Sequence, residues 1–245
     1  MNQIKTPPLQ LSKLSGGYAK QVIFSDLSLD VQAGEIFGLI GLNGVGKTTL
    51  IKAILDLGRA EGEILIFGKN HCLPESRQQL AYLPEKFLPS PQLKGWEFLD
   101  LTLAYYGRKV DRTKAHELAI GLDLLPDALE SPTKTYSKGM GQKLGLLATL
   151  LTELPLLILD EPMSGLDPRS RSMLKDRLVE YRQAGRTIFF SSHILADIEE
   201  ICDRVGIMHG GRLIYLGTPA ELISRWQANG LERAFLAAIN NAEHP

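Results

Sequence analysis

The sequence predicts an α/β protein in which a mostly parallel sheet is interrupted by an inserted helical segment. Two short apolar runs, residues 36–40 and 156–159, are typical of strands buried in a parallel sheet. Residues 86–152 instead follow a helical spacing and contain no convincing strand pattern. Strands and helices alternate outside that segment, which implies a mostly parallel sheet with helices on both faces.

The strands can be placed in chain order. Up to about residue 60, short alternating strands are expected around Gly16 and Gly17. The run at 36–40 leads into a glycine-rich turn and a helix, and residues 63–68 form a further strand that is closed by glycine. Beyond the helical segment, strand patterns return at residues 156–159, 187–190 and 205–208.

One helix can be recognised from its first residues. Asp167 can cap the helix, and Pro168 suits its first turn because proline lacks the N–H that would be unpaired there. The helix ends before Gly185, and its apolar face carries Leu174, Leu178 and Tyr181.

Composition excludes several classes of protein. The chain has 245 residues, of which 44% are hydrophobic and 22% charged, so it can bury a full core and is not disordered. Twenty-seven basic residues oppose 28 acidic ones, and the formal charge of −1 gives no overall attraction to nucleic acid or anionic lipid. We therefore expect no nucleic-acid partner.

The remaining composition favours a reducing, cytoplasmic setting. Cys72 and Cys202 show no CxxC or Cys/His-cluster spacing, so the sequence indicates neither a zinc site nor a disulfide framework. Residues 1–10 lack the apolar stretch of a secretory signal. The most apolar stretch, residues 144–159, is broken by polar residues and proline, so we expect no membrane span.

The glycine-rich turn after residue 40 carries a phosphate-binding motif. It fits GxxxxGK[ST] between a predicted strand and a predicted helix, which is the context that the motif requires. Its backbone N–H groups would cradle phosphates at a helix N-terminus, Lys47 would reach the β- and γ-phosphates, and Thr48 would bind Mg²⁺. The alternative is a chance glycine-rich turn. The motif comprises Gly41, Leu42, Asn43, Gly44, Val45, Gly46, Lys47, Thr48 and Thr49.

A second candidate site follows the strand at 156–159, which ends in two carboxylates. Parallel sheets bind ligands beyond the carboxyl ends of their strands, and Asp160 suits the Mg²⁺ shell there. Alternation along the chain turns Glu161 away from Asp160, toward a position from which it can orient and deprotonate a water that attacks the γ-phosphate. Taken alone, a strand that ends in Asp-Glu more often begins an ordinary solvated loop, and the functional interpretation depends on the preceding phosphate-binding motif.

The segment before that strand resembles a known family. Residues 136–142, Tyr-Ser-Lys-Gly-Met-Gly-Gln, resemble the LSGGQ signature of ABC-type ATPases, and the resemblance covers nearly the whole chain. Tyr18 falls at the position of the adenine-stacking aromatic, residues 164–167 resemble the D-loop, and His193 resembles the switch histidine. Taken singly, Tyr18 could be a turn aromatic, Ser137 a helix cap and His193 a polar residue at a helix start.

The resemblance implies a fold and a division of the chain. It implies a P-loop NTPase core with a mostly parallel sheet, a small N-terminal antiparallel β subdomain and an inserted helical subdomain. Residues 1–245 would form one ABC ATPase domain. Residues 1–85 and 153–218 would form the nucleotide-binding core, residues 86–152 the helical subdomain with the signature, and residues 219–245 a short helical tail.

It also implies a mechanism with two partners. ATP and Mg²⁺ would be bound by two domains placed head-to-tail, in a homodimer or a heterodimer, and a separate membrane permease would hold them at the inner face of the membrane. Ser137 and the Gly139 backbone would contact the γ-phosphate held by the partner's P-loop, and His193 would stabilise charge in the transition state. The catalytic residues would be Lys47, Glu161 and His193.

Two departures from the family pattern carry information. Glu85 stands where many members have the glutamine of the Q-loop, so we expect it to bind Mg²⁺ or a water with an added negative charge. Lys138 and Met140 replace two residues of the signature. These features and the tail at 231–236 resemble single-domain bacterial ATPases of exporters. The segment after Glu85 would then receive the permease's coupling helix.

Two other functions stay open on the same residues. An ABC ATPase without a permease, working as a switch in assembly or repair, would need the same motifs. A nucleotide-dependent binding protein that does not hydrolyse ATP would be expected to lack the general base, yet Glu161 is present.

Overall fold

The computed structural model describes residues 6–18 and 21–243. Residues 1–5, part of the segment in which no secretory signal was expected, lie outside the described residues. Two sheets form the framework. The larger has the strand order β10-β9-β3-β8-β7-β6. Its strands are β3 (Ile36–Ile40), β6 (Leu80–Leu83), β7 (Leu156–Asp160), β8 (Thr187–Ser192), β9 (Arg204–His209) and β10 (Arg212–Gly217).

The larger sheet is mostly parallel, as predicted. Every neighbouring pair is parallel except the terminal pair β9 and β10. Strands β3, β7 and β8 are buried along their whole lengths, which explains their continuous apolar sequences. Their register pairs Asp160 with Ser191 and Ile40 with Ser192, so the carboxyl ends of these three strands meet at one edge.

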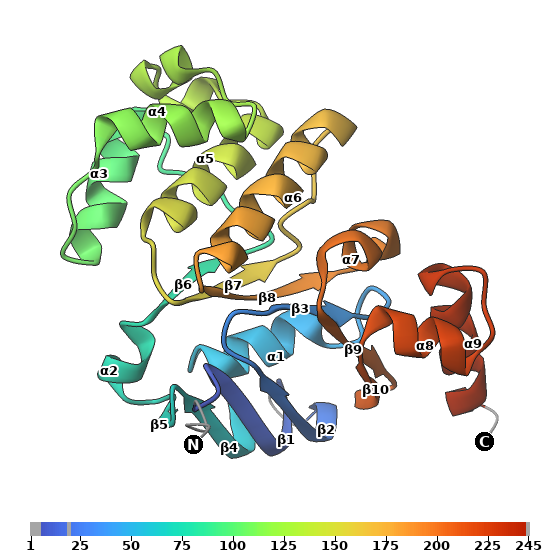
Figure 1. The fold of residues 1–245 in the computed structure, drawn as a ribbon. Coiled ribbons are helices and arrows are strands. Elements are labelled where there is room, and N and C mark those ends of the chain that lie inside the picture. Colours follow the sequence, from blue (N-terminus) through green and yellow to red (C-terminus); the bar gives the residue numbers. More distant parts are fainter. Residues whose placement is uncertain (1–5, 19–20, 244–245) are drawn as a thin grey trace, which may run out of the picture.

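The smaller sheet confirms the predicted N-terminal antiparallel β subdomain. It has the order β2-β1-β4-β5, with β1 (Leu9–Tyr18), β2 (Gln21–Val31), β4 (Ala60–Ile66) and β5 (Lys69–Asn70). Helix α1 (Lys47–Ile54) lies between the two sheets (Figure 1). One face of the parallel sheet is therefore covered by a helix together with a second sheet, and not by helices alone. In this layer Phe37 stacks on Phe189 with ring centroids 5.6 Å apart.

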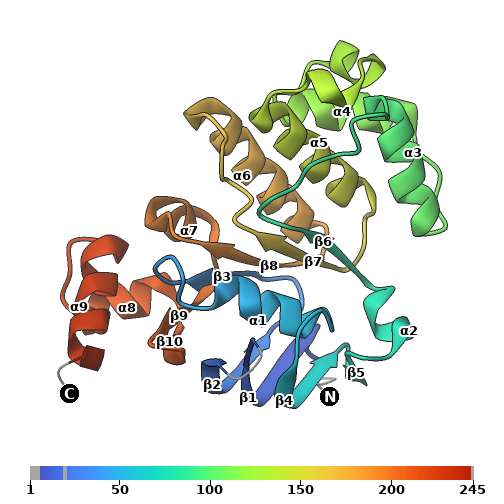
Figure 2. The same cartoon turned by 180° about the vertical axis from the view of Figure 1, so that it is seen from behind.

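Helices cover the opposite face of the parallel sheet and extend beyond it (Figures 1 and 2). Helix α2 (Pro74–Arg77) precedes β6. Between β6 and β7 the chain forms α3 (Gly95–Tyr105), α4 (Arg112–Gly121), η1 (Pro126–Glu130), η2 (Thr133–Thr135) and α5 (Lys138–Leu151). The last helices are α6 (Pro168–Gln183), α7 (Leu195–Ile201), α8 (Pro219–Arg225) and α9 (Leu231–Glu243).

Helix α6 begins as its sequence predicts. The Asp167 carboxylate accepts a hydrogen bond from the Ser170 backbone N–H at 3.0 Å, and Pro168 occupies the first turn. The apolar residues of the predicted face are buried. Within residues 6–18 and 21–243, every helix is too short or too polar to cross a membrane.

Candidate functional site

The turn between β3 and α1 is shaped by glycine. Gly44 and Gly46 have φ values of 80° and 111°, a region that side chains with a Cβ rarely adopt. Both positions of the turn therefore favour glycine. The Lys47 ammonium folds back over the turn and donates to the Gly41 carbonyl at 2.8 Å.

The end of β7 holds two carboxylates in different surroundings. Asp160 is fully buried, and its Oδ1 accepts a hydrogen bond from the Ser191 hydroxyl at 2.6 Å. Glu161 has a φ of 49°, so a left-handed turn, and not the strand alternation assumed from the sequence, directs its side chain away from Asp160. The Glu161 N–H donates to the same Ser191 hydroxyl at 3.0 Å.

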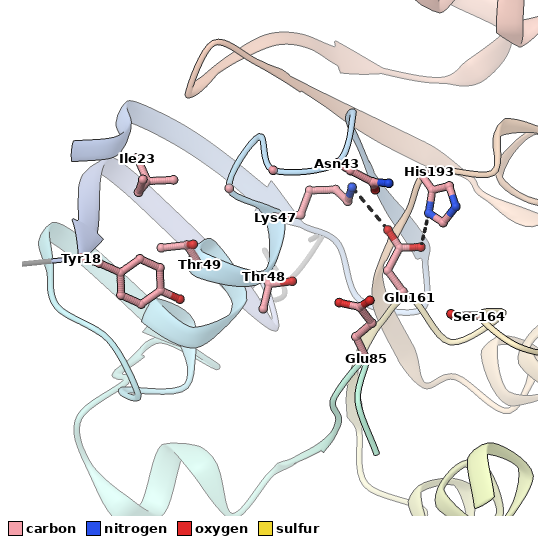
Figure 3. Close-up of a pocket in the computed structure, with 12 residues that line it drawn as sticks. Tyr18, Ile23, Asn43, Lys47, Thr48, Thr49, Glu85, Glu161, Ser164 and His193 are labelled. Carbon is pink, nitrogen blue, oxygen red and sulfur yellow. Dashed lines mark hydrogen bonds and ion pairs between the residues drawn. The ribbon is translucent and has the colours of Figure 1, made fainter. Parts of the chain in front are cut away.

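Lys47, Glu161 and His193 form a continuous polar chain (Figure 3). The Lys47 Nζ lies 3.3 Å from Glu161 Oε1, and His193 Nδ1 lies 2.8 Å from Glu161 Oε2. The lysine and the carboxylate are buried, whereas 45% of the histidine side chain is exposed. One ring nitrogen of His193 is thus held by the carboxylate, and the ring still reaches solvent.

A cavity of about 420 Å³ joins these groups to residues from the other sheet. Tyr18 comes from β1, Glu85 from the segment after β6, and Glu161 and His193 from the carboxyl ends of β7 and β8 (Figure 3). Of the remaining predicted site residues, the cavity wall includes Asn43, Gly44, Gly46, Lys47, Thr48 and Thr49. It does not include Gly41, Leu42, Val45 or the predicted metal ligand Asp160.

The electrostatics beneath the cavity favour a cation. Burial raises the pKa of the Asp160 carboxyl group; the Ser191 and Thr48 hydroxyls oppose this shift, and the carboxylates of Glu85 and Glu161 add to it. Asp160 Oδ2 is buried and has no hydrogen-bond partner among the described residues. A carboxylate oxygen in that position fits a bound Mg²⁺, because a buried acceptor otherwise requires a partner.

Comparison with known proteins agrees with this geometry. Residues 24–164 match the model of the family described as "ABC transporter". The chain belongs to this family, as one of its ATP-binding subunits. The membership confirms the resemblance carried by residues 136–142, and the predicted P-loop fold with it.

Individual relatives that match most of this chain are named ATP-binding proteins. An uncharacterized ABC transporter ATP-binding protein of Nostoc sp. is 40% identical and matches 83% of this chain, which spans 62% of that protein's length. The linearmycin resistance ATP-binding protein LnrL of Bacillus subtilis is 30% identical, and the match covers 96% of this chain and 80% of the length of LnrL. A solved ATP-binding subunit of an ABC transporter superposes with a TM-score of 0.87 at 34% identity. The match covers 94% of this chain and 98% of the solved chain.

The ABC signature of this chain lies outside the P-loop cavity of the same chain. Ser137 caps α5, where its hydroxyl accepts from the Met140 N–H at 3.2 Å. Gly139 faces the D-loop, and a Cβ at this position would lie 3.3 Å from the Gly165 carbonyl oxygen. Neither Ser137 nor Gly139 lines the cavity that holds Lys47 and Glu161.

Two residues at or beside the cavity were not predicted from the sequence. Ser191 bonds to both Asp160 and Glu161, yet a serine inside a buried strand carries no motif, and its place just before His193 was the one available signal. Ile23 lines the cavity beside Tyr18 and appears in the sequence as an ordinary strand residue.

Proposed function

We propose that the chain binds MgATP in this cavity, hydrolyses it, and uses the reaction to drive transport through a separate membrane permease. The observation that carries the proposal is the convergence of Lys47, Glu161 and His193 beside a glycine-rich phosphate-binding turn. A switch in assembly or repair would use the same residues. The relatives' names favour transport over that alternative.

Each group suits one part of the hydrolysis. The P-loop N–H groups and Lys47 hold the phosphates, while the Tyr18 ring packs against the adenine base. Glu161 accepts a proton from the water whose oxygen forms the new bond to the γ-phosphorus, and the bond to the ADP oxygen breaks. His193 keeps Nδ1 on Glu161, so a doubly protonated ring would donate from Nε2 to the γ-phosphate.

Mg²⁺ would be held by Thr48 and Asp160, with Glu85 as a further ligand or a holder of water. The unpartnered Oδ2 of Asp160 supports this arrangement. The ion would neutralise charge on the phosphate oxygens. Ser191 fixes the other oxygen of Asp160 and so restricts the orientation of the carboxylate.

A second ATPase domain completes the site in this proposal. Because Ser137 and Gly139 lie outside their own chain's cavity, their N–H groups and the α5 dipole are available to a γ-phosphate bound by a partner domain. The two domains would face head-to-tail around two ATP molecules, as a homodimer or a heterodimer. ATP would thus favour the closed state, and hydrolysis would release it.

We further propose an exporter whose permease holds this chain at the cytoplasmic face of the membrane. The relative LnrL is named for resistance to linearmycin, which fits outward transport. Residues 86–152 would form the subdomain that contacts the permease, residues 1–85 and 153–218 the nucleotide-binding core, and residues 219–245 the tail.

The test compares the wild type with Glu161→Gln by light scattering in excess MgATP, with phosphate release measured in parallel. We expect the variant to accumulate as an ATP-dependent dimer while its phosphate release falls by roughly 10²- to 10⁴-fold. The control Glu117→Gln removes an exposed carboxylate of α4 and should behave as wild type. A monomeric variant together with an inactive wild type would contradict the proposal.

A further inference from the structure

Three side chains of the types that bind metals gather beside the antiparallel sheet, away from the P-loop cavity. Asp56 lies in the turn after α1, and His71 and Cys72 lie in the turn after β5. One ligand atom from each lies within 4.8 Å of the other two. The site is therefore assembled from two turns that are separate in the sequence, and it combines oxygen, nitrogen and sulfur donors.

The separations suit a small tetrahedral ion. Cys72 Sγ lies 3.6 Å from Asp56 Oδ1 and 3.6 Å from His71 Nε2. Zinc–sulfur and zinc–nitrogen bonds at the tetrahedral angle place their donor atoms about 3.5 Å apart. The sulfur is also 3.8 Å from His71 Nδ1, so it faces the ring, and a rotation of the imidazole about χ2 is needed to direct one lone pair at an ion.

The two turns are already held together by other residues. Arg77 Nη1 donates to Asp56 Oδ2 at 2.9 Å and to the His71 carbonyl at 3.1 Å, which leaves Asp56 Oδ1 for the thiol. The Asn70 side chain accepts the Cys72 N–H at 3.0 Å. The backbone positions of the ligands are thus fixed without a metal, and only side-chain rotation is required.

Solvent can reach the cluster. Asp56 and Cys72 are exposed, and all three side chains line a cavity of about 630 Å³ that also touches Gly16 and Gly17 of β1. Three protein ligands leave a fourth position for water or a small ligand in this cavity. The arrangement has the ligand number of an open zinc site and differs from a closed structural one.

We propose that Asp56, His71 and Cys72 form a binding site for a borderline-soft divalent transition metal of the Zn²⁺ class. The thiolate and the imidazole favour such an ion over Mg²⁺ or Ca²⁺, which prefer oxygen. Binding replaces the thiol proton with the ion, and the proton passes to solvent. The site uses none of the residues assigned to ATP binding, so a test of metal binding does not depend on the proposed ATPase activity.

The test is a titration of the metal-free, fully reduced chain with Co²⁺. We expect one ion per chain, a thiolate-to-Co²⁺ charge-transfer absorption, and its displacement by Zn²⁺ but not by excess Mg²⁺. Cys72→Ser should abolish this absorption. His71→Ala and Asp56→Asn should each weaken binding by at least about tenfold.

Cys202→Ser is the matched control, because the chain has two cysteines and Cys202 lies in a separate place, after α7. This variant should keep both the absorption and the affinity. Absence of the absorption in the wild type, its persistence in Cys72→Ser, or its loss in Cys202→Ser would each overturn the proposal. Melting temperatures of the metal-free variants show whether each is folded, and because three separate ligands are changed, a single misfolded variant does not decide the result.

Discussion

The Lys47 ammonium lies 3.3 Å from the Glu161 carboxylate, and both side chains are buried. The lysine proposed to bind phosphate and the proposed general base therefore form an ion pair with each other in the absence of a ligand. A phosphate group that enters the cavity must share the lysine with Glu161.

This ion pair predicts a specific pattern of stability. Lys47→Met leaves the buried Glu161 charge without its lysine partner and should lower the free energy of unfolding by about 1–3 kcal/mol. Adding Glu161→Gln to Lys47→Met should restore most of the lost free energy of unfolding. Urea unfolding of the wild type, the two single variants and the double variant measures this coupling energy. If the losses caused by the two single substitutions simply add in the double variant, the coupling is refuted. Lys86→Met, an exposed site, is the control.

Tyr18 should contribute to nucleotide affinity through its ring. The residue lines the cavity and is 49% exposed, so its ring is accessible to a planar ligand. Stacking on a base is worth about 1–3 kcal/mol, so Tyr18→Ala should weaken ATP binding roughly 5- to 150-fold, whereas Tyr18→Phe should bind normally. Calorimetry with tripolyphosphate, which has no base, supplies the control. Equal losses for both ligands would argue against stacking.

Ser191 should act as a positioning residue for Asp160, the carboxylate proposed to bind Mg²⁺. Ser191→Ala removes the hydroxyl that donates to Asp160 Oδ1 at 2.6 Å and should raise the Mg²⁺ concentration for half-maximal phosphate release by about 10- to 100-fold. Ser191→Thr keeps a hydroxyl and should recover part of the effect. Ser76→Ala removes another buried hydroxyl, outside the cavity, and should leave the Mg²⁺ dependence unchanged. A loss of stability without a shift in Mg²⁺ dependence would assign Ser191 a structural role only.

The Asp123 carboxylate links helix α5 to helix α6. Hydrogen bonds from Lys143 and Ser170 lower the pKa of its carboxyl group below the ordinary value of 3.8. A lowered pKa stabilises the fold above 3.8, and this contribution is lost as the pH falls through the folded-state pKa. Asp123→Asn should therefore cost about 1 kcal/mol at neutral pH, and its difference from wild type should shrink in acid.

Urea unfolding across that pH range tests the prediction. The control Asp127→Asn removes an exposed carboxylate of η1 and should show no comparable trend. A difference between Asp123→Asn and wild type that stays constant with pH would mean that the loss comes from packing and not from the charge.

The sequence predicted features that depend on local pattern. The continuous apolar strands gave the parallel sheet, because only fully buried strands omit polar alternation. Their carboxyl ends share one edge, and this topology alone brings Lys47 close to Glu161 although the two are far apart in the chain. The spacing of the glycine-rich turn predicted its place before α1 for the same local reason.

Features that depend on contacts between distant turns were not predictable. Strand alternation predicted that the Glu161 side chain points away from Asp160. The direction is instead set by a left-handed backbone conformation at Glu161, which no single residue type indicates. Cys72 showed no metal-ligand spacing because one of its neighbours, Asp56, comes from another turn. Ser191 gained its two partners through the register of β8 against β7, which the sequence of either strand leaves open.

The P-loop cavity joins two sheets that also contact each other directly, for example where the Ser25 N–H donates to the Gly211 carbonyl at 2.9 Å. Tyr18 belongs to the antiparallel sheet, whereas Glu161 and His193 follow strands of the parallel sheet. A ligand that touches all three adds a removable cross-link between two layers whose strand ladders are separate. When the cavity is filled, neither layer can open without breaking ligand contacts, so the sheets should exchange their amide protons as one cooperative unit.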